Sequence, residues 1–432
     1  MDTLSILRGG GIMKTKIESI VKRACKNTKE NLQECFDSLK RTKAVGVDGI
    51  TKLDYQKDID INLENLVESL NLYQYRPKPV RRVEILKEDG SSRPIGISCT
   101  EDKIIQEMSR QVLEAIYEPV FSETSYGFRP NRSCHDALRR LNAEVMKKPV
   151  NWIVDMDISK FFDSMPHKEI LSMLEERIGD KKFLRLVSRL LKVGIQFPNG
   201  VVYDELGSPQ GSVVSHVIAN VFLDKVLDKW FEEILKPYFS GYCEFIRYAD
   251  DGIAFFEKEE DALKFLKVLP LRLAKFGLEL NLGKTKLVKI GKVEAYQKEL
   301  LGKRMPTFDF LGFTHYWGKS NTGKLRLKRK TSKKRFRRAL VSLNQWLKEQ
   351  RNRLTLQQLW KIISSKIRGH YNYFGVTDNI HTLQRFEYEA KRLIFARINR
   401  RSQCKSFTWK EFNGYLKIFP LPKPKISVNL GW

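Results

Sequence analysis

The spacing of apolar positions changes period several times in the first third of the chain. Apolar residues recur with helical spacing over residues 17–42, 56–73 and 102–118. Between the last two, the stretch RRVEILKEDGSSRPIGI, residues 81–97, alternates around an Asp-Gly step, which is typical of two short strands and a turn. The pattern therefore predicts helices interrupted by a β-hairpin.

The centre of the chain mixes strands with helices. Residues 151–165 begin as an apolar strand, and residues 204–235 pass from a turn-rich piece into a long, largely apolar helix. Residues 245–256, FIRYADDGIAFF, read as a hairpin with adjacent Asp250 and Asp251 at its turn. A helix over 259–275 and strand-like segments over 277–291 and 308–317 follow.

From Thr331 onward the pattern predicts three helices, near 331–350, 355–373 and 379–401. No internal repeat or low-complexity tract is present in the sequence. The fold class predicted is α+β, with a mixed body followed by a helical bundle.

The charge balance indicates a polyanionic partner. The chain has 432 residues and a formal net charge of +27, from 78 basic and 51 acidic residues. Residues 324–432 hold 27 Lys/Arg against 5 Asp/Glu, so they carry +22 of that excess. Since no stretch reaches the roughly 20 apolar residues of a membrane span, nucleic acid is favoured over membrane.

The densest basic segment is residues 324–338, with 10 basic residues in 15 and no acidic one. It leads into helix-patterned sequence, which favours a folded face that binds a phosphate backbone over a disordered tail. The candidate nucleic-acid-binding residues are Lys324, Arg326, Lys328, Arg329, Lys330, Lys333, Lys334 and Arg337.

The six cysteines are scattered and form no CxxC pair, which predicts reduced structural thiols and no zinc site. The N-terminal residues lack the apolar core of a signal peptide. The expected location is therefore cytoplasmic.

Three carboxylates are the candidate catalytic groups. Asp157 ends the apolar strand that starts near residue 151, about 90 residues before the Asp250-Asp251 pair. Two strand-end carboxylates and a hairpin carboxylate can converge on divalent cations, and Mg²⁺ prefers oxygen ligands. A pair of such ions activates a hydroxyl and stabilises a phosphoryl transition state, which is polymerase or nuclease chemistry.

Ordered sequence blocks carry a resemblance to a known family. DISKFF (157–162), SPQGS (208–212), RYADD (247–251), GLELNLGKTK (277–286) and FLGF (310–313) occur in that order. Upstream, VGVDGI, RPIGI and SYGFRPNRSCHDAL add to them. Together the chain, over about residues 40–432, resembles the reverse transcriptases encoded by bacterial group II introns.

The resemblance implies a right-hand polymerase architecture of fingers, palm and a helical thumb or maturase bundle. The implied domains are an N-terminal helical extension (1–40), fingers and palm (41–323), the basic thumb (324–401) and a short C-terminal tail (402–432). No endonuclease domain is implied, because that domain of relatives needs more chain and paired cysteines.

The resemblance implies Asp157, Asp250 and Asp251 as catalytic metal ligands, with Ile158 as a further metal-binding position. Two Mg²⁺ ions are the implied cofactors, with Mn²⁺ as an alternative. Asp155 and Asp163 compete with Asp157, which is preferred because the family spacing places an aromatic residue five positions later, at Phe162. A bulky ring there would exclude a ribose 2′-hydroxyl.

The implied deoxynucleotide-binding residues are Lys87, Arg93, Phe162, Gln210 and Lys284. Lys87 and Arg93 flank the fingers hairpin turn, where a point charge and a planar fork suit a triphosphate. Lys284 is a candidate to neutralise departing pyrophosphate, the alternative being a plain surface lysine. His216 departs from the family pattern, which usually has proline there, and receives no catalytic role.

The implied function is RNA-directed DNA synthesis together with binding of intron RNA as a maturase in splicing and retrohoming. The implied partners are a template or structured RNA, a DNA primer or target, and deoxynucleotides; the oligomeric state stays open. Two alternatives remain: a domesticated relative in phage defence or DNA repair, and a non-catalytic RNA-binding splicing factor.

Overall fold

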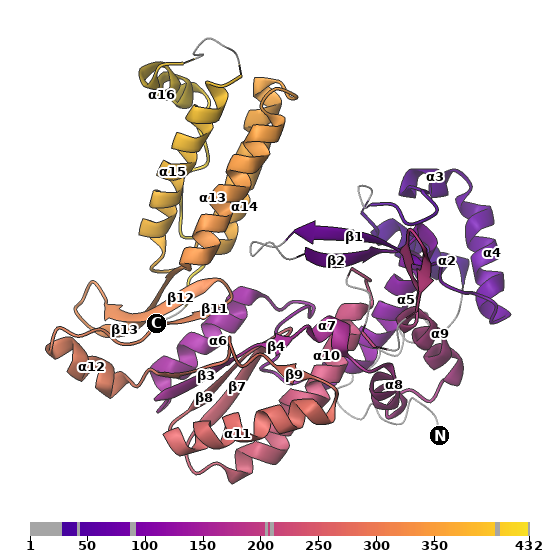
Figure 1. The fold of residues 1–432 in the computed structure, drawn as a ribbon, viewed down its shortest axis with the longest axis horizontal. Helices are drawn as coiled ribbons and strands as arrows, with labels where there is room; N and C mark the ends of the chain where they lie inside the picture. Colours follow the sequence, from indigo (N-terminus) through magenta and orange to yellow (C-terminus); the bar gives the residue numbers. More distant parts are fainter. Residues whose placement is uncertain are drawn as a thin grey trace. The chain divides into compact units, whose positions relative to one another are not determined.

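The computed structural model describes residues 28–40, 44–86, 92–203, 206–207, 211–401 and 407–430 (Figure 1). The chain divides into two compact units. The first unit comprises Met1–Ala137, Met156–Ala254 and Glu260–Lys286, and the second comprises Leu138–Asp155, Phe255–Glu259 and Leu287–Trp432. This division follows contacts within the chain, whereas the predicted domain boundaries at 40, 323 and 401 stay predictions.

A four-stranded sheet of order β10-β3-β8-β7 carries the predicted central hairpin. Its strands are β3 (Trp152–Met156), β7 (Cys243–Tyr248), β8 (Asp251–Phe256) and β10 (Lys286–Lys289). In β8 every residue after Asp251 is buried, because Gly252 to Phe256 are all small or apolar. The predicted hairpin over residues 245–256 is confirmed. Because both strands are buried in the sheet, the position of the turn between them is fixed.

A second four-stranded sheet, of order β2-β1-β5-β6, contains the predicted upstream hairpin. Its strands are β1 (Val80–Leu86), β2 (Ser92–Ile97), β5 (Ile195–Phe197) and β6 (Gly200–Val202). β1 and β2 pair antiparallel with Val83 opposite Ile95. The predicted hairpin over 81–97 is therefore confirmed in its strands, while the predicted Asp-Gly turn lies outside the described residues.

The predicted helix over 102–118 is confirmed, and the one over 56–73 appears as two helices. Of the helix predicted over 17–42, residues 29–38 are helical, while residues 17–27 and 41–42 lie outside the described residues. Several helices of the first unit begin with a side-chain cap. Thr51 and Asp54 form a capping box, and Asp180 accepts two backbone N–H bonds at the start of α9. The helices that lie wholly or mainly in this unit are α2 (Lys29–Ser38), α3 (Lys52–Lys57), α4 (Ile59–Asn71), α5 (Thr100–Tyr117), η1 (Glu118–Val120), α7 (Phe161–Ser164), α8 (His167–Glu175), α9 (Lys181–Leu191), α10 (Ser215–Leu223), η2 (Asp224–Asp228), η3 (Trp230–Leu235), η4 (Lys236–Tyr238) and α11 (Glu259–Lys275). Strands β4 (Ile158–Ser159) and β9 (Glu279–Leu280) pair antiparallel in the same unit.

The second unit combines a three-stranded antiparallel sheet with long helices. The strands are β11 (Phe308–Phe310), β12 (Phe313–Lys319) and β13 (Leu325–Thr331). Its helices are α6 (Cys134–Lys147, mainly in this unit), α12 (Lys292–Leu300), α13 (Lys333–Gln350), α14 (Leu356–Phe374), α15 (Ile380–Ile398) and α16 (Trp409–Ile418). Figure 1 shows α13, α14 and α15 running side by side, as the sequence predicted for a C-terminal bundle.

One buried asparagine ties the sheet of the second unit to its bundle. Asn379 is fully buried and accepts a hydrogen bond from the Thr331 backbone N–H through Oδ1. Its Nδ2 donates to Thr331 Oγ1 and to the Phe374 carbonyl. The end of β13 is thereby fixed to the connection between α14 and α15.

Within the described residues, no helix is long and apolar enough to cross a membrane. Cys35, Cys99 and Cys243 are buried thiols that form no disulfide. Burial raises the pKa of the Cys243 thiol to about 11 and that of Cys99 to about 11, so both stay protonated at neutral pH. These three agree with the prediction of structural thiols, whereas Cys25 and Cys404 lie outside the described residues.

Candidate active site

The turn between β7 and β8 presents the adjacent carboxylates. Ala249 adopts a left-handed backbone with φ of 57°, which reverses the chain in two residues between the strands. Asp250 is half-buried and Asp251 is exposed, although the strands on both sides are buried. The buried hairpin therefore pushes two charged side chains to the edge of the sheet.

Asp157 comes to the same edge of the sheet. The Asn151 N–H, just before β3, donates to the Phe256 carbonyl at the end of β8 over 2.9 Å. A Cβ on Gly252 would lie 2.9 Å from Met156 Cγ, so the other ends of the two strands also lie together. The two contacts show that β3 and β8 run antiparallel, and counting from Asn151 and Phe256 puts Met156 opposite Asp251. The end of β3, and with it Asp157, is therefore beside the Asp250-Asp251 turn.

Lys284 contacts Asp157 directly. Its Nζ donates to Asp157 Oδ2 over 2.9 Å, with the two side chains 66% and 28% exposed. The Asn281 N–H donates to the Asp157 carbonyl over 2.8 Å, and Ile158 pairs with Leu280. The block at residues 277–286 is thus placed against the predicted catalytic strand, although the sequence separates the two by more than a hundred residues.

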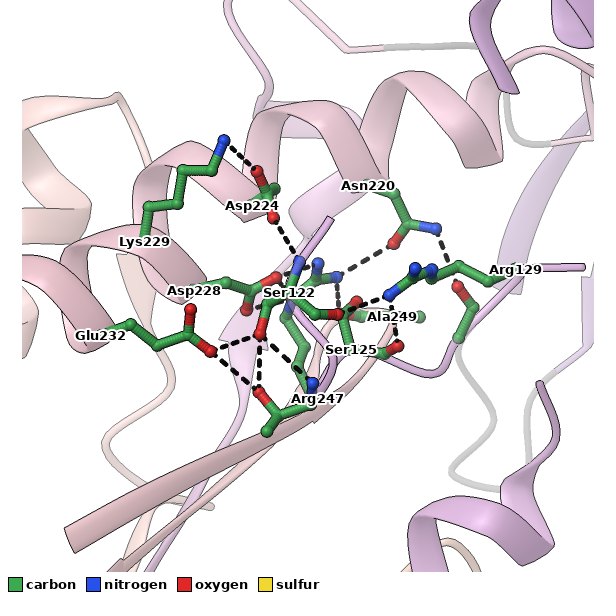
Figure 2. A network of polar contacts seen from close by, with 12 residues as sticks. Ser122, Ser125, Arg129, Asn220, Asp224, Asp228, Lys229, Glu232, Arg247 and Ala249 are labelled. Carbon is green, nitrogen blue, oxygen red and sulfur yellow. Dashed lines mark hydrogen bonds and ion pairs between the residues drawn. The ribbon is translucent and has the colours of Figure 1, made fainter. Parts of the chain in front are cut away.

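A buried arginine holds the turn between β7 and β8 in place through its hydrogen bonds (Figure 2). Arg247 is fully buried, and its Nε and Nη2 donate to the Asp228 carboxylate at 2.8 and 2.5 Å. Its Nη1 donates to Asn220 Oδ1 and to the Ala249 carbonyl, each at 3.0 Å. Arg247 therefore joins the reversed backbone at Ala249 to two residues of the α10–η2 helical run.

The segment before α6 closes this support from another side. The Tyr126 N–H donates to the Arg247 carbonyl over 2.8 Å, and the Arg247 N–H donates to the Thr124 carbonyl over 3.0 Å. A Cβ on Gly127 would lie only 2.2 Å from the Ala249 N, so glycine is required for this approach. Asn220 Nδ2 fixes the same residue by donating to the Gly127 carbonyl.

A second arginine anchors that segment. Arg129 is 6% exposed and donates through Nη1 to the carbonyls of Ser122 and Ser125 at 2.5 and 2.9 Å. It also forms an ion pair with Glu118. Figure 2 shows the contacts of Arg129 with Ser122 and Ser125 in one network with Arg247. The backbone around the turn is therefore held by hydrogen bonds on both flanks.

An aromatic cluster lies at the predicted sugar-discriminating position. The His216 ring stacks on Phe128 with centroids 3.9 Å apart, and its centroid is 5.9 Å from that of Phe162 in an edge-on contact. Burial lowers the pKa of His216, so this ring is neutral at pH 7. His216 thus packs against Phe162, which agrees with the structural role predicted for it.

Comparison with known families assigns the fold that carries this arrangement. The model of the reverse transcriptase (RNA-dependent DNA polymerase) family matches residues 85–315, more than half of the chain. The chain belongs to this reverse transcriptase family. The predicted reverse transcriptase family and its mixed helix-and-sheet polymerase fold are thereby confirmed, whereas the bacterial origin stays a prediction. Reverse transcriptases in general depend on metal ions for activity.

Relatives of this reverse transcriptase include intron-encoded proteins. The group II intron-encoded protein LtrA of Lactococcus lactis is 34% identical over 232 residues, covering 49% of this chain and 38% of the relative. The putative COX1/OXI3 intron 2 protein of Saccharomyces cerevisiae is 42% identical over 171 residues, covering 39% of this chain and 20% of the relative. The chain thus matches less than two fifths of the length of either relative.

One solved structure shows a more distant likeness. Telomerase from Candida albicans, solved with a TWJ fragment of telomeric RNA, aligns with a TM-score of 0.43 and 12% identity. The alignment covers 86% of this chain and 68% of that chain. A likeness at this level carries no further argument.

The donor set at the sheet edge of this reverse transcriptase suits a divalent cation in its chemistry. Carboxylate oxygens are preferred ligands of Mg²⁺ and Mn²⁺, and those of Asp157 and Asp251 reach solvent. In the described part of the chain, no three acidic, His or Cys side chains lie close enough together to hold a metal ion. The Lys284 ammonium forms an ion pair with the Asp157 carboxylate.

Several predicted nucleotide-binding residues lie where the structure gives no side chain. Lys87 and Gln210 fall outside the described residues, and for Arg93 only the backbone pairing with Ile85 is described. Gly211 adopts a φ of 112°, and a Cβ there would lie 2.9 Å from the Gly96 carbonyl oxygen. The backbone at Gly211 therefore approaches the RPIGI strand closely.

The predicted basic segment is a strand followed by a helix, and its side chains differ in exposure. Arg326 is 14% exposed in its side chain, and Arg329 is 3% exposed as a residue. Lys328 is half-buried. The exposed members are Lys324, Lys330, Lys333, Lys334 and Arg337.

Sequence reasoning gave no role to Asp228, Asn220 or Gly127. Asn220 lies in a largely apolar stretch, but Asp228 is one of several charged residues between 224 and 233, so the sequence does not single it out as buried. Its partner could not be named either, because Arg247 lies 19 positions further along the chain, in a different element.

Proposed function

We propose that this protein is an RNA-directed DNA polymerase that extends a primer with deoxynucleotides. The observation that carries the proposal is the placement of Asp157, at the end of β3, beside the Asp250-Asp251 turn, with Lys284 in contact with Asp157. Nucleotidyl transfer needs the 3′-hydroxyl of the primer to be activated, which acidic ligands do through bound metal ions. It also needs the charge of the leaving pyrophosphate to be neutralised, which a cation such as Lys284 can do.

In this proposal Asp157, Asp250 and Asp251 hold two Mg²⁺ ions, with Ile158 beside them and Mn²⁺ as an alternative. When bound, the ions supply Lewis-acid activation of the primer hydroxyl and charge stabilisation at the α-phosphate. Lys284 then exchanges its contact with Asp157 for the negative charge of the departing pyrophosphate. Phe162, packed against His216, limits the room beside the sugar and selects deoxynucleotides. Lys87, Arg93 and Gln210 complete the nucleotide site in the proposal.

Arg247 is a positioning residue in this scheme. It touches neither substrate nor metal, and acts by holding the Ala249 carbonyl and hence the direction of the turn. Since displacement by about 1 Å can cost a hundredfold in rate, the buried contact to Asp228 matters for catalysis as well as for stability.

Primer extension on an RNA template tests the polymerase. The double variant Asp250→Ala/Asp251→Ala should lose at least about a thousandfold in the rate of incorporation, since ion-mediated stabilisation supplies several kcal/mol. Glu260→Ala, which removes an exposed acid from α11, is the control and should extend the primer normally. Retained activity in the double variant would overturn the site assignment, and splicing assistance without any incorporation by the wild type would favour a non-catalytic RNA-binding factor.

We further propose that the protein binds structured intron RNA as a maturase. Two observations support this: relatives include group II intron-encoded proteins, and exposed cations cluster from Lys330 through Arg337 in the second unit. Phosphate contacts of this kind give affinity that falls with salt. Intron DNA targets and retrohoming belong to the same proposal.

Salt-dependent RNA binding tests that face. The triple variant Lys330→Gln/Lys333→Gln/Lys334→Gln should lower the slope of log affinity against log salt by about 2 to 3. The matched triple Lys192→Gln/Lys267→Gln/Lys275→Gln removes the same charge from exposed positions of the first unit. Equal loss in both triples would show that only overall charge matters and would overturn the assignment of the face.

A further inference from the structure

The second unit contains a cavity of about 960 Å³ that is separate from the carboxylate edge described above. Its walls come from α6, α12, the turn between β12 and β13, β13 itself, and the connection between α14 and α15. Ligand cavities in proteins typically measure about 300 to 1,000 Å³, so this one has room for a small organic molecule.

One wall of the cavity is cationic. Lys292, Lys324, Arg326 and Arg329 line it, and Asp378 is the acidic residue among the lining side chains. Asp378 forms an ion pair with Arg326. Four cations against one carboxylate leave an excess of positive charge, which favours an anionic ligand.

Arg329 is the buried member of that wall. It is 3% exposed, and its Nη2 donates to Asn142 Oδ1 over 2.6 Å and to the Leu327 carbonyl over 3.0 Å. Its Nε is buried without a hydrogen-bond partner, and Arg329 makes no ion pair with any side chain that the structure describes. A buried guanidinium without an anion is costly, so an anion in the cavity would compensate an existing charge.

A second set of lining side chains is aromatic and apolar. Val293 and Tyr296 project from one face of α12 with helical spacing and are 70% and 57% exposed. Both line the cavity, together with Met146 and Leu327. A planar ring can stack on Tyr296 while an anionic group on the same molecule reaches the arginines.

We propose that this cavity binds one nucleotide, with its phosphate at Arg326 and Arg329 and its base against Tyr296. A nucleotide combines an anion and a flat aromatic body in one molecule, which the two walls match. The nucleotide comes either from a free mononucleotide or from a base unstacked out of a bound RNA strand. The site lies outside the proposed polymerase residues and goes beyond the proposed function.

The titration of Arg329 supports this arrangement. The pKa of Arg329 is lowered to about 10, chiefly by burial; the Asp378 carboxylate opposes this shift and the Arg326 charge adds to it. Charged groups facing Arg329 from the adjoining elements are therefore Arg326 on its own strand and Asp378 in the α14–α15 connection. A phosphate would return the guanidinium to an ordinary environment.

Calorimetric titration of the full chain with adenosine 5′-monophosphate, in EDTA, tests the site. EDTA removes the divalent cations that a polymerase nucleotide site needs, so failure here is distinguishable from failure of the proposed function. We expect saturable binding that weakens about 5- to 100-fold in Tyr296→Ala, the range of a lost base–aromatic stack. Tyr388→Ala removes a tyrosine of almost equal exposure, 58%, from α15 and should leave binding unchanged.

Adenosine without phosphate tests the cationic wall without altering the protein. It should bind at least about tenfold more weakly than the monophosphate, because charge-assisted hydrogen bonds are lost. The variant Arg326→Gln should reduce that difference. Equal binding of nucleoside and nucleotide, absence of saturable binding, or equal effects of Tyr296→Ala and Tyr388→Ala would each overturn the proposal.

Photocrosslinking separates the two sources of the nucleotide. A short RNA with one 8-azidoadenosine should crosslink to residues of α12, and adenosine monophosphate should compete, if the base comes from bound RNA. Binding of the monophosphate without that crosslink assigns the site to free nucleotides. A crosslink to α12 that the monophosphate does not displace contradicts the cavity as its position.

Discussion

Arg247 and Arg329 are both almost completely buried, and their surroundings differ in one respect. Arg247 contacts the Asp228 carboxylate with two nitrogens, and its third nitrogen donates hydrogen bonds to Asn220 and Ala249. Arg329 has an amide and a peptide carbonyl as partners, a buried Nε without one, and no ion pair within the described residues. The first is a closed structural contact, while the second has the chemistry of an incomplete site.

The difference shows how burial of charge can be interpreted. A buried ion pair with satisfied hydrogen bonds needs no further molecule, so its function is to hold backbone, here the turn at Ala249. A buried cation without an anion carries a desolvation cost, so its presence indicates a function that requires it. The same residue type therefore holds the turn at Ala249 in one unit and indicates a ligand in the other.

The largest expected effect is the loss of the anion beside Arg247. Asp228→Asn should destabilise the protein by about 3–5 kcal/mol, because a buried guanidinium is left without its charge partner. Urea unfolding measures this change. Primer extension under conditions where the variant is still folded should also slow, since the Ala249 carbonyl loses its fixed donor.

The double variant Arg247→Met/Asp228→Leu is the matched test. Removing both charges avoids the uncompensated ion, so stability should recover most of the loss while primer extension stays slow. A double variant as unstable as Asp228→Asn would show that the shape of the network, and not its charge pairing, matters most. Full activity in the double variant would contradict the positioning role of Arg247.

The second effect concerns acid stability around Arg329. His315 lies opposite Arg329 in the β12–β13 ladder and is 1% exposed. Burial, and then the charge of Arg329, lower the pKa of His315 to about 3. Below the ordinary value of 6.5 the unfolded chain takes up a proton that the folded protein refuses, so stability falls as pH falls from about 6.5 towards 3.

Between pH 6.5 and 4.5 this single group should remove about 2–3 kcal/mol of stability. His315→Leu lacks the titration, so the difference between wild type and variant should shrink or reverse as pH is lowered across that window. Denaturant unfolding at several pH values measures it, with exposed His381→Leu as the control for the substitution itself. Parallel pH profiles for wild type and His315→Leu would exclude this cause of acid sensitivity.

The carboxylates of Asp157 and the Asp250-Asp251 turn were easier to predict from the sequence than the cavity, for a physical reason. The hairpin at residues 245–256 and the strand before Asp157 are local patterns in which apolar runs are followed by carboxylates. The resemblance to reverse transcriptases then linked segments that periodicity alone cannot connect. Contacts such as Lys284 with Asp157 join distant segments, and only the fold reveals them.

The basic segment shows what was missed and why. Its charge density suggested one phosphate-binding face leading into a helix, whereas residues 325–331 form β13. Leu325, Leu327, Arg329 and Thr331 share one parity, and the alternation of Leu with basic residues was a period-2 signal. That a long basic side chain occupies a buried strand position depends on the cavity wall, which no local pattern encodes.

The third effect tests how little the supported turn can move. Gly127→Ala places a Cβ 2.2 Å from the Ala249 N, which is backbone and cannot rotate away. We expect a loss of about 1–3 kcal/mol and slower primer extension, because the turn must shift. Gly369→Ala is the matched control: nothing lies within 4 Å of its Cβ, and alanine in the interior of α14 should stabilise by up to about 1 kcal/mol. Equal tolerance at both glycines would contradict the rigidity of the turn.

The smallest effect is the most informative about Arg329. If its charge is uncompensated in the absence of ligand, Arg329→Met should change the free energy of unfolding by less than about 1 kcal/mol or increase it, because methionine fills part of the volume without a desolvation cost. The loss of the contact to Asn142 opposes this gain. Adding adenosine monophosphate should stabilise the wild type and not Arg329→Met, since ligand that binds the folded state raises its stability. A destabilisation as large as that of Asp228→Asn, without any ligand-dependent difference, would place Arg329 with Arg247 as a purely structural cation and remove the contrast between the two.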